Sequence, residues 1–391
     1  MAYQLPSAAR RLGALPPYPF AVLNQRVREM TARGVDVIRL DIGSPDMPPP
    51  APVVVALTAS ARRADRHGYA GYKGTPAIRA AIARYYRERF GVEVNPETQV
   101  LPLIGSKEGI VNLSLAFLDR GDAALVPAIG YPSYEMGAHL AGGDVCRVPL
   151  DPTTYLPDLG AVPADVLSRA KLLWINYPNN PTGAVAEPDF YRRCVEFCAA
   201  HNLLLASDNP YVDVTFDGYT ATSALEAPGA LDCTIEFMSF SKTFNMAGWR
   251  LGAAVGSAAA LATLLQVKSN VDSGHFEAIY DAGVAAVETT PRAWIDARNQ
   301  VYAARRDRAL AILPRIGLRA LTPRGSLYLW ARADDGDGGA YAEQALAAAG
   351  VVLAPGAIYG PDGRDYVLIS IAVEDARLDE ALRRLESWYA K

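Results

Sequence analysis

The stretch that decides the fold is Ser239-Phe240-Ser241-Lys242-Thr243-Phe244-Asn245-Met246-Ala247-Gly248-Trp249-Arg250-Leu251-Gly252. It opens at the end of an apolar run that has the length of a buried strand. Lysine is rarely buried unless it is paired or used in chemistry. Lys242 therefore has two interpretations, an ordinary loop lysine or an amine that forms a Schiff base with an aldehyde cofactor. In the second, Ser239 and Arg250 would bind the cofactor's phosphate, the arginine through two parallel hydrogen bonds.

Similar apolar runs lie on both sides of this stretch. Each ends in Gly, Pro, Asn or Asp, and helix-length segments separate them. Continuous apolar runs are typical of strands that are buried on both faces, as in a mostly parallel sheet covered by helices. The predicted strands are AALVPA at 123–128, LLWINYP at 172–178, LLLASDNP at 203–210, TIEFMSF at 234–240 and LGAAVG at 251–256. The chain is therefore predicted to be α/β, with functional loops at the strand ends.

The ends of the chain have a different pattern. Helical spacing is present at 53–67 and 76–90, and an Arg- and Ala-rich helix is predicted at 291–312. Strands at GSLYLWA and YVLISIA and a helix at 375–389 follow it, which indicates a smaller α+β unit. We predict an N-terminal segment (1–45) packed on the small domain and a partner subunit, a large domain (46–290) and a small α+β domain (291–391).

Composition excludes several classes of protein. Of 391 residues, 50% are hydrophobic and 20% charged, which excludes a disordered chain, and the net charge of −4 without long basic runs argues against nucleic acid as a partner. No apolar tract is long enough for a signal peptide or a membrane span. Four scattered cysteines (Cys146, Cys194, Cys198 and Cys233) form neither a disulfide framework nor a metal site, so the expected location is the reducing cytoplasm, with no bound metal.

Three further strand ends carry polar residues. Asp208 follows a buried strand in LASDNPY, where a carboxylate needs a cationic partner such as a protonated pyridine nitrogen. Asn180 in NYPNNPTG can reach a ring oxygen, although Asn, Pro and Gly also simply make turns. In GSKEG the amides of Gly105, Ser106 and Lys107 can bind a phosphate at a helix N-terminus, or the serine can be an ordinary helix cap.

Taken in order, seven runs resemble one family over nearly the whole chain. The sequence is similar to the class I and II aminotransferases, which are pyridoxal 5′-phosphate enzymes of fold type I. LPPYPF at 15–20, YAGYKG and LPLIGSKEG resemble in particular the subgroup of LL-diaminopimelate and alanine aminotransferases. The seven runs are DIGSPD (41–46), GYAGYKG (68–74), GSKEG (105–109), GYPSY (130–134), NYPNNPTG (176–183), SDNPY (207–211) and SFSKTFNMAGWRLG (239–252).

The resemblance implies a role for each matching residue. Lys242 would hold the cofactor as a Schiff base and then carry the proton between the substrate's α-carbon and the cofactor. Asp208 would keep the pyridine nitrogen protonated. The other cofactor contacts would be Tyr211 and Asn180 on the phenolic oxygen, Tyr131 on the ring face, Gly105, Ser106, Lys107, Ser239 and Arg250 on the phosphate, and Tyr69 on the phosphate of the partner subunit. Gly43 and Asn180 would lie at the substrate's carboxylate.

The same resemblance implies the architecture and the activity. The fold would be α/β, with a seven-stranded, mostly parallel sheet between helices and a smaller α+β domain. The protein would be a homodimeric, cytoplasmic aminotransferase that moves an amino group between an amino acid and a 2-oxo acid. Two alternatives stay open: a fold type I enzyme of elimination, cyclisation or decarboxylation, and a non-catalytic binding module.

One position departs from the family's pattern. The run YVLIS at 366–370 has Leu368 where the family usually has an arginine that binds the substrate's α-carboxylate. An apolar side chain cannot replace a bidentate cation. Another cation such as Arg364 would then supply the charge, or backbone donors and Asn180 would hold the carboxylate, or the substrate lacks a carboxylate there.

Overall fold

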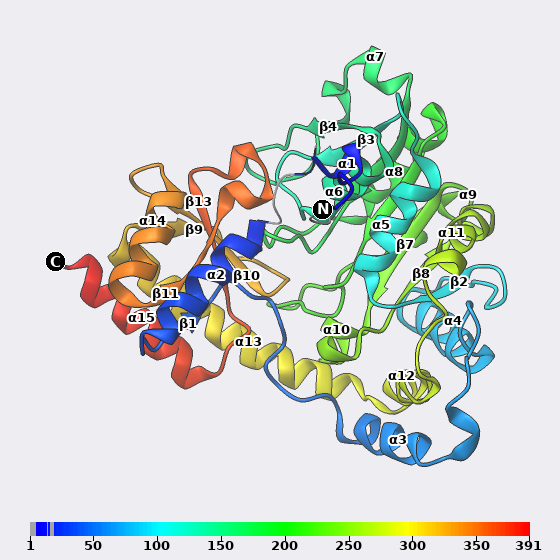
Figure 1. Ribbon diagram of the computed structural model, residues 1–391, viewed down its shortest axis with the longest axis horizontal. Coiled ribbons are helices and arrows are strands. Elements are labelled where there is room, and N and C mark those ends of the chain that lie inside the picture. The colour runs from blue at the N-terminus through cyan, green and yellow to red at the C-terminus, as the bar shows by residue number, and fades with distance from the viewer. Residues whose placement is uncertain (1–4, 14, 16–18) are drawn as a thin grey trace, which may run out of the picture.

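The computed structural model describes residues 5–13, 15 and 19–391, so most of the LPPYPF stretch lies outside the described residues. A seven-stranded sheet forms the larger half of the molecule (Figure 1). Of these seven strands, β8 runs opposite to the other six, so the prediction of a mostly parallel sheet is confirmed. In sheet order the strands are β2 (Val100–Leu103), β8 (Gly252–Gly256), β7 (Thr234–Ser239), β6 (Leu204–Asp208), β5 (Ala170–Ile175), β3 (Ala123–Pro127) and β4 (Asp144–Val148).

Helices cover both faces of this sheet, as predicted. Side chains alternate along each strand, and the alternation divides the core in two. Leu173 and Leu205 pack with helices α4, α8 and α12 on one face, whereas Trp174 and Ala206 pack with α5, α6 and α11 on the other. These helices are α4 (Pro76–Phe90), α5 (Ser106–Phe117), α6 (Ser133–Ala141), α8 (Pro188–His201), α11 (Ala258–Val271) and α12 (Glu277–Thr289), and α3 (Ala51–Ala61) packs on α12.

Local sequence explains where these helices begin and end. The Thr75 hydroxyl accepts from the Ile78 amide, Pro76 is the first residue of α4, and Gly91 ends the helix with φ of 68°. The predicted helix at 76–90 is therefore confirmed at both ends. Cys194 and Cys198 are buried on α8, as expected of small core residues.

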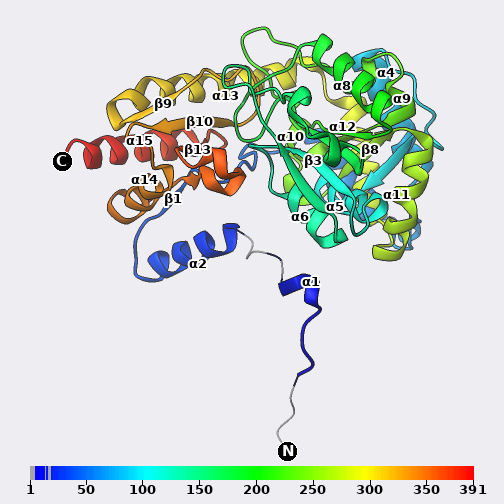
Figure 2. The ribbon, with the colours of Figure 1, turned by 90° about the horizontal axis from the view of Figure 1, so that it is seen from above.

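The smaller half is α+β. It contains the antiparallel sheet of β12 (Ala354–Pro355), β13 (Tyr366–Ser370), β10 (Tyr328–Ala333) and β9 (Leu318–Ala320), which packs with α13 (Arg292–Ile312), α14 (Gly338–Gln344) and α15 (Asp375–Tyr389). In the N-terminal part, α2 (Pro19–Ala32) lies beside this half in both views (Figures 1 and 2), and β1 (Ile38–Arg39) pairs with β11 (Val351–Val352). The domain limits 1–45, 46–290 and 291–391 stay a prediction.

The other helices are short: α1 (Arg10–Gly13), α7 (Ala164–Leu167), α9 (Ala230–Cys233) and α10 (Phe240–Thr243). In the part of the chain that the structure describes, no helix is both long and apolar enough to cross a membrane. Within the same residues, no three His, Cys, Asp or Glu side chains come together as a metal site.

Candidate active site

A cavity of about 200 Å³ lies at the carboxyl ends of the parallel strands, where loops of α/β proteins carry function. Nine of the eleven residues predicted to bind the cofactor line it. They are Ser106, Lys107, Tyr131, Asn180, Asp208, Tyr211, Ser239, Lys242 and Arg250, and Pro210, Ser241, Ala247 and Tyr328 complete the wall. Residues from six separate stretches of sequence therefore meet in one place.

Asp208 is the last residue of β6 and is almost fully buried. Burial raises the pKa of its carboxyl to about 7, and a hydrogen bond from the Tyr134 hydroxyl to Oδ2 at 2.7 Å opposes that rise. The second oxygen, Oδ1, is buried and has no hydrogen-bond partner among the residues that the structure describes. A buried acceptor of this kind is costly unless a donor from a ligand completes it.

Lys242 lies on α10, a single helical turn that follows β7. Its Nζ donates a hydrogen bond to the carbonyl of Gly43 and lies 5.9 Å from the centre of the Tyr211 ring. Burial, and then the charge of Arg250, lowers the pKa of Lys242 to about 8. The amine is therefore neutral more often near neutral pH than an ordinary lysine, and the neutral form is the nucleophile.

The start of α5 contributes Ser106 and Lys107 to the cavity wall. Gly105 precedes the helix with φ of 75°, and a Cβ there would lie 2.3 Å from Nη2 of Arg250. Only glycine therefore lets the guanidinium approach the helix N-terminus, where an anion is favoured. The backbone carbonyl of Arg250 contacts Nε2 of His275 at 2.7 Å, which helps to hold this residue in its left-handed conformation.

Tyr328 lines the cavity, and Gly43 packs against the Tyr328 hydroxyl. A Cβ on Gly43 would lie 1.8 Å from the Tyr328 hydroxyl, so this position also requires glycine. The Tyr328 hydroxyl is 2.9 Å from that of Tyr211. Gly43 accepts the hydrogen bond of Lys242 but does not itself line the cavity, and its place at the substrate's carboxylate stays a prediction.

Tyr69 does not come to the cavity of its own chain. The residue is 91% exposed and does not line the cavity. Leu368 is fully buried in the apolar core of the small half. It pairs across the sheet with Trp330, on the strand face that also carries Tyr328, but it does not line the cavity. Arg364 is exposed and is also absent from the cavity wall.

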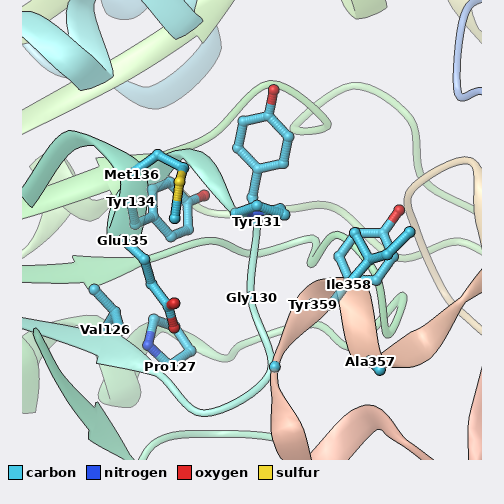
Figure 3. Close-up of a pocket in the computed structure, with 12 residues that line it drawn as sticks. Val126, Pro127, Gly130, Tyr131, Tyr134, Glu135, Met136, Ala357, Ile358 and Tyr359 are labelled. Atoms are coloured by element: carbon cyan, nitrogen blue, oxygen red, sulfur yellow. The ribbon is translucent and has the colours of Figure 1, made fainter. Parts of the chain in front are cut away.

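A second cavity of about 340 Å³ shares Tyr131 with the first. Figure 3 shows Tyr131 and Tyr134 on one side of it and Ile358 and Tyr359 on the other. Its lining is mainly apolar, and the carboxylate of Glu135 at its edge is paired with Arg147 at 2.7 Å. Tyr131, on the wall of the first cavity, therefore also lies where the large half meets the small half of the molecule.

Three residues of the site escaped the sequence interpretation. Tyr134 lies three positions after Tyr131, a helical spacing that places both at one helix start. Tyr328 and Trp330 are two positions apart on a predicted strand, so the sequence could have shown that they share one face of the strand. Arg298 donates to the backbone carbonyls of Lys242 and Thr243, and nothing in its Arg-rich helix distinguishes it from its neighbours.

Comparison with known proteins identifies the family. The family model for aminotransferase class I and II matches residues 35–385. The chain belongs to the class I and II aminotransferases. An LL-diaminopimelate aminotransferase of Dehalococcoides mccartyi is 44% identical over 97% of this chain and 98% of its own. The one from Moorella thermoacetica is 45% identical over 96% of this chain and 97% of its own. The predicted family and subgroup resemblance are confirmed.

Solved structures agree with this family assignment. Apo-BacF from Bacillus subtilis superposes with a TM-score of 0.94 at 34% identity over 98% of both chains. Aspartate aminotransferase from Thermus thermophilus with maleate gives 0.89 at 29% identity over 98% of this chain and all of the other. Fold type I is thus confirmed. The protein is a pyridoxal 5′-phosphate-dependent aminotransferase, an enzyme that moves an amino group between an amino acid and a 2-oxo acid.

The side chains of this aminotransferase fit its cofactor. A protonated ring nitrogen would give the unpartnered Oδ1 of Asp208 the donor it lacks. A phosphate would meet the start of α5 and the guanidinium of Arg250, which the absent side chain of Gly105 allows to lie together. The donors and the acceptor line one cavity, as a molecule with both groups requires.

Proposed function

We propose that Lys242 is the lysine that binds the cofactor covalently and the base and acid of the reaction. When bound, pyridoxal 5′-phosphate supplies an electron sink for the charge left when the substrate's Cα–H bond breaks. Lys242 would take that proton at Nζ and return it one step later. A pKa of about 8 suits both directions, because the amine can lose and regain a proton near neutral pH.

The other residues would position the cofactor. Asp208 would pair with the ring nitrogen, Tyr131 would cover the ring face, and Tyr211 and Asn180 would contact the phenolic oxygen. The phosphate would be held by the residues around the start of α5 and by Ser239 and Arg250. The observation that carries this assignment is the cavity itself, where nine predicted residues meet beside the unpartnered Oδ1 of Asp208.

The substrate side of the proposal concerns the carboxylate. The relatives are named for LL-diaminopimelate, and we infer a related amino acid as a donor. Leu368 cannot bind its α-carboxylate, and Arg364 lies outside the cavity wall. Asn180 lines the cavity, and its amide can present nitrogen or oxygen according to how the group is turned. We therefore assign the carboxylate to Asn180 and to the backbone beside Gly43.

One titration tests both parts. Purified holoenzyme is mixed with LL-diaminopimelate, simple amino acids and amines that lack a carboxylate, and the cofactor's absorbance reports its conversion to the amine form. Conversion by amino acids supports the proposal. Conversion by carboxylate-free amines alone would support a second function, transamination of amines, which the lack of an arginine at position 368 favours. A cofactor that no donor converts would contradict both.

We further propose a homodimer in which Tyr69 reaches the partner's phosphate. Its 91% exposed side chain is the supporting observation. Coexpression of Tyr69→Ala and Lys242→Ala subunits tests this, since a hybrid dimer would contain one site with both residues intact. Random pairing should restore about a quarter of the wild-type activity. If activity stays at the level of the separate variants, Tyr69 does not act across subunits.

The location and domain limits complete the proposal. None of the four cysteines forms a disulfide, which is typical of a protein from a reducing compartment, and we place the enzyme in the cytoplasm. We also keep the division into an N-terminal segment (1–45), a large domain (46–290) and a small domain (291–391). Limited proteolysis and fractionation of the source cells test these two points.

A further inference from the structure

Helix α13 connects the two halves of the molecule (Figure 1) and carries three buried arginines. Arg305 pairs with Asp46 at 2.9 Å and Arg306 pairs with Asp217 at 2.6 Å. Arg298, on the same helix, forms no ion pair in the part of the chain that the structure describes. A buried guanidinium without a carboxylate is costly unless other acceptors surround it.

Backbone carbonyls supply those acceptors. Nη1 of Arg298 donates to the carbonyls of Lys242 at 2.7 Å and Thr243 at 2.6 Å. Nη2 donates to the carbonyl of Asp213 at 2.6 Å. Asn299 orients the group by accepting from Nε and Nη2, and its own amide donates to the same Asp213 carbonyl at 2.9 Å. The planar fork of arginine suits this arrangement, because it presents several donors in fixed directions.

These carbonyls belong to two short segments of the active site, the single turn of α10 and the loop after Tyr211. Helix α10 is one turn long, and the carbonyls of Lys242 and Thr243 lie at its C-terminal end, where helical partners are missing. A cation at that end also interacts favourably with the helix dipole. Asp213 is two residues beyond Tyr211, so the same guanidinium joins the turn of the lysine to the loop of the tyrosine.

We propose that Arg298 is the positioning residue of Lys242: it fastens the backbone of the lysine and the loop after Tyr211 to the helix that connects the two halves of the enzyme. The inference rests on the role proposed for Lys242. Arg298 does not line the cavity. Its effect is to keep Nζ aimed at the cofactor.

The test compares Arg298→Met, Arg298→Lys and Arg306→Met. Methionine keeps the apolar stem and removes all donors, whereas lysine keeps the charge and loses the fork. Arg306 is the matched control, because it is equally buried at 3% exposed on the same helix and contacts Asp217 and Pro323 instead of the lysine turn. Urea unfolding of each variant shows how much stability is lost, and all kinetics are measured well below the unfolding transition.

Two measurements distinguish a role in positioning Lys242 from a general loss of stability. In the apoenzyme, acetic anhydride modifies lysines, and mass spectrometry gives the rate at Lys242 relative to the exposed Lys171 across pH. In the holoenzyme, kcat and KM are measured with one amino donor. Arg298→Met should lower kcat on the order of 10- to 100-fold with KM nearly unchanged, because misplacing a reacting group by about 1 Å has such an effect. The relative reactivity of Lys242 should change in the same variant.

Arg298→Lys should fall between wild type and Arg298→Met, and Arg306→Met should leave both readouts near wild type despite its lost stability. Equal effects of Arg298→Met and Arg306→Met, or none in Arg298→Met, would overturn the proposal. Borohydride reduction of wild-type holoenzyme identifies the modified lysine independently. If it were not Lys242, the proposed function would fail, while the apoenzyme measurement would still report on the Arg298 contact.

Discussion

Replacing Asp208 with asparagine should make the stability of the apoenzyme less sensitive to pH. Burial raises the pKa of Asp208 from 3.8 to about 7 in the folded protein. The folded state therefore holds this proton at pH values where the unfolded state has lost it, so stability is full below pH 3.8 and falls as the pH rises to about 7. At 1.36 kcal/mol per pH unit the complete loss is about 4 kcal/mol, of which roughly 3 kcal/mol falls between pH 5 and pH 8.

Asparagine has no proton to lose, and its oxygen can still accept from the Tyr134 hydroxyl. Urea unfolding of the apoenzymes at pH 5 and pH 8 measures the effect. The free energy of unfolding of Asp208→Asn should rise relative to wild type by roughly 3 kcal/mol between the two pH values. The comparison is repeated in a Lys242→Ala background, because Lys242 titrates in the same range. A difference that does not change with pH would refute the argument, since it would mean that Asp208 is already ionised at pH 5.

Three further predictions follow from the site. Lys242→Ala should leave the cofactor bound only non-covalently, and mass spectrometry after borohydride reduction should find no modified peptide; a modified peptide would remove the covalent role from this residue. Gly105→Ala should weaken cofactor binding about tenfold or more, because the new Cβ meets Arg250 and the left-handed backbone costs about 1–2 kcal/mol, as equilibrium dialysis can measure. Leu368→Arg should lower KM for simple amino acids about tenfold at some cost in stability, since a charge-assisted hydrogen bond to a carboxylate contributes about 1.5–3 kcal/mol; an unchanged KM would place the carboxylate elsewhere.

The fold class could be predicted because it depends on local patterns, whereas the roles of the cofactor residues came from the resemblance to a known family and stay predictions. A continuous apolar run is compatible with few environments, and a sheet covered on both faces is one of them. Lys242, Asp208 and Asn180 each follow such a run, and parallel strands bring their carboxyl ends to one edge of the sheet. The strand order of the folded sheet then brings these three residues into one cavity.

The tertiary structure decided what depends on contacts between distant segments. A pattern shows which face of an element is buried, but not which side chain will lie opposite it. Three contacts are of that kind. The Tyr134 hydroxyl donates to Asp208, the Tyr328 hydroxyl packs against Gly43, and Arg298 donates to the backbone carbonyl of Lys242. The pKa values of Asp208 and Lys242 belong with them, because desolvation is set by every segment that packs around a group. The sequence determined which residues could do chemistry here, and packing determined the protonation and orientation in which they are held.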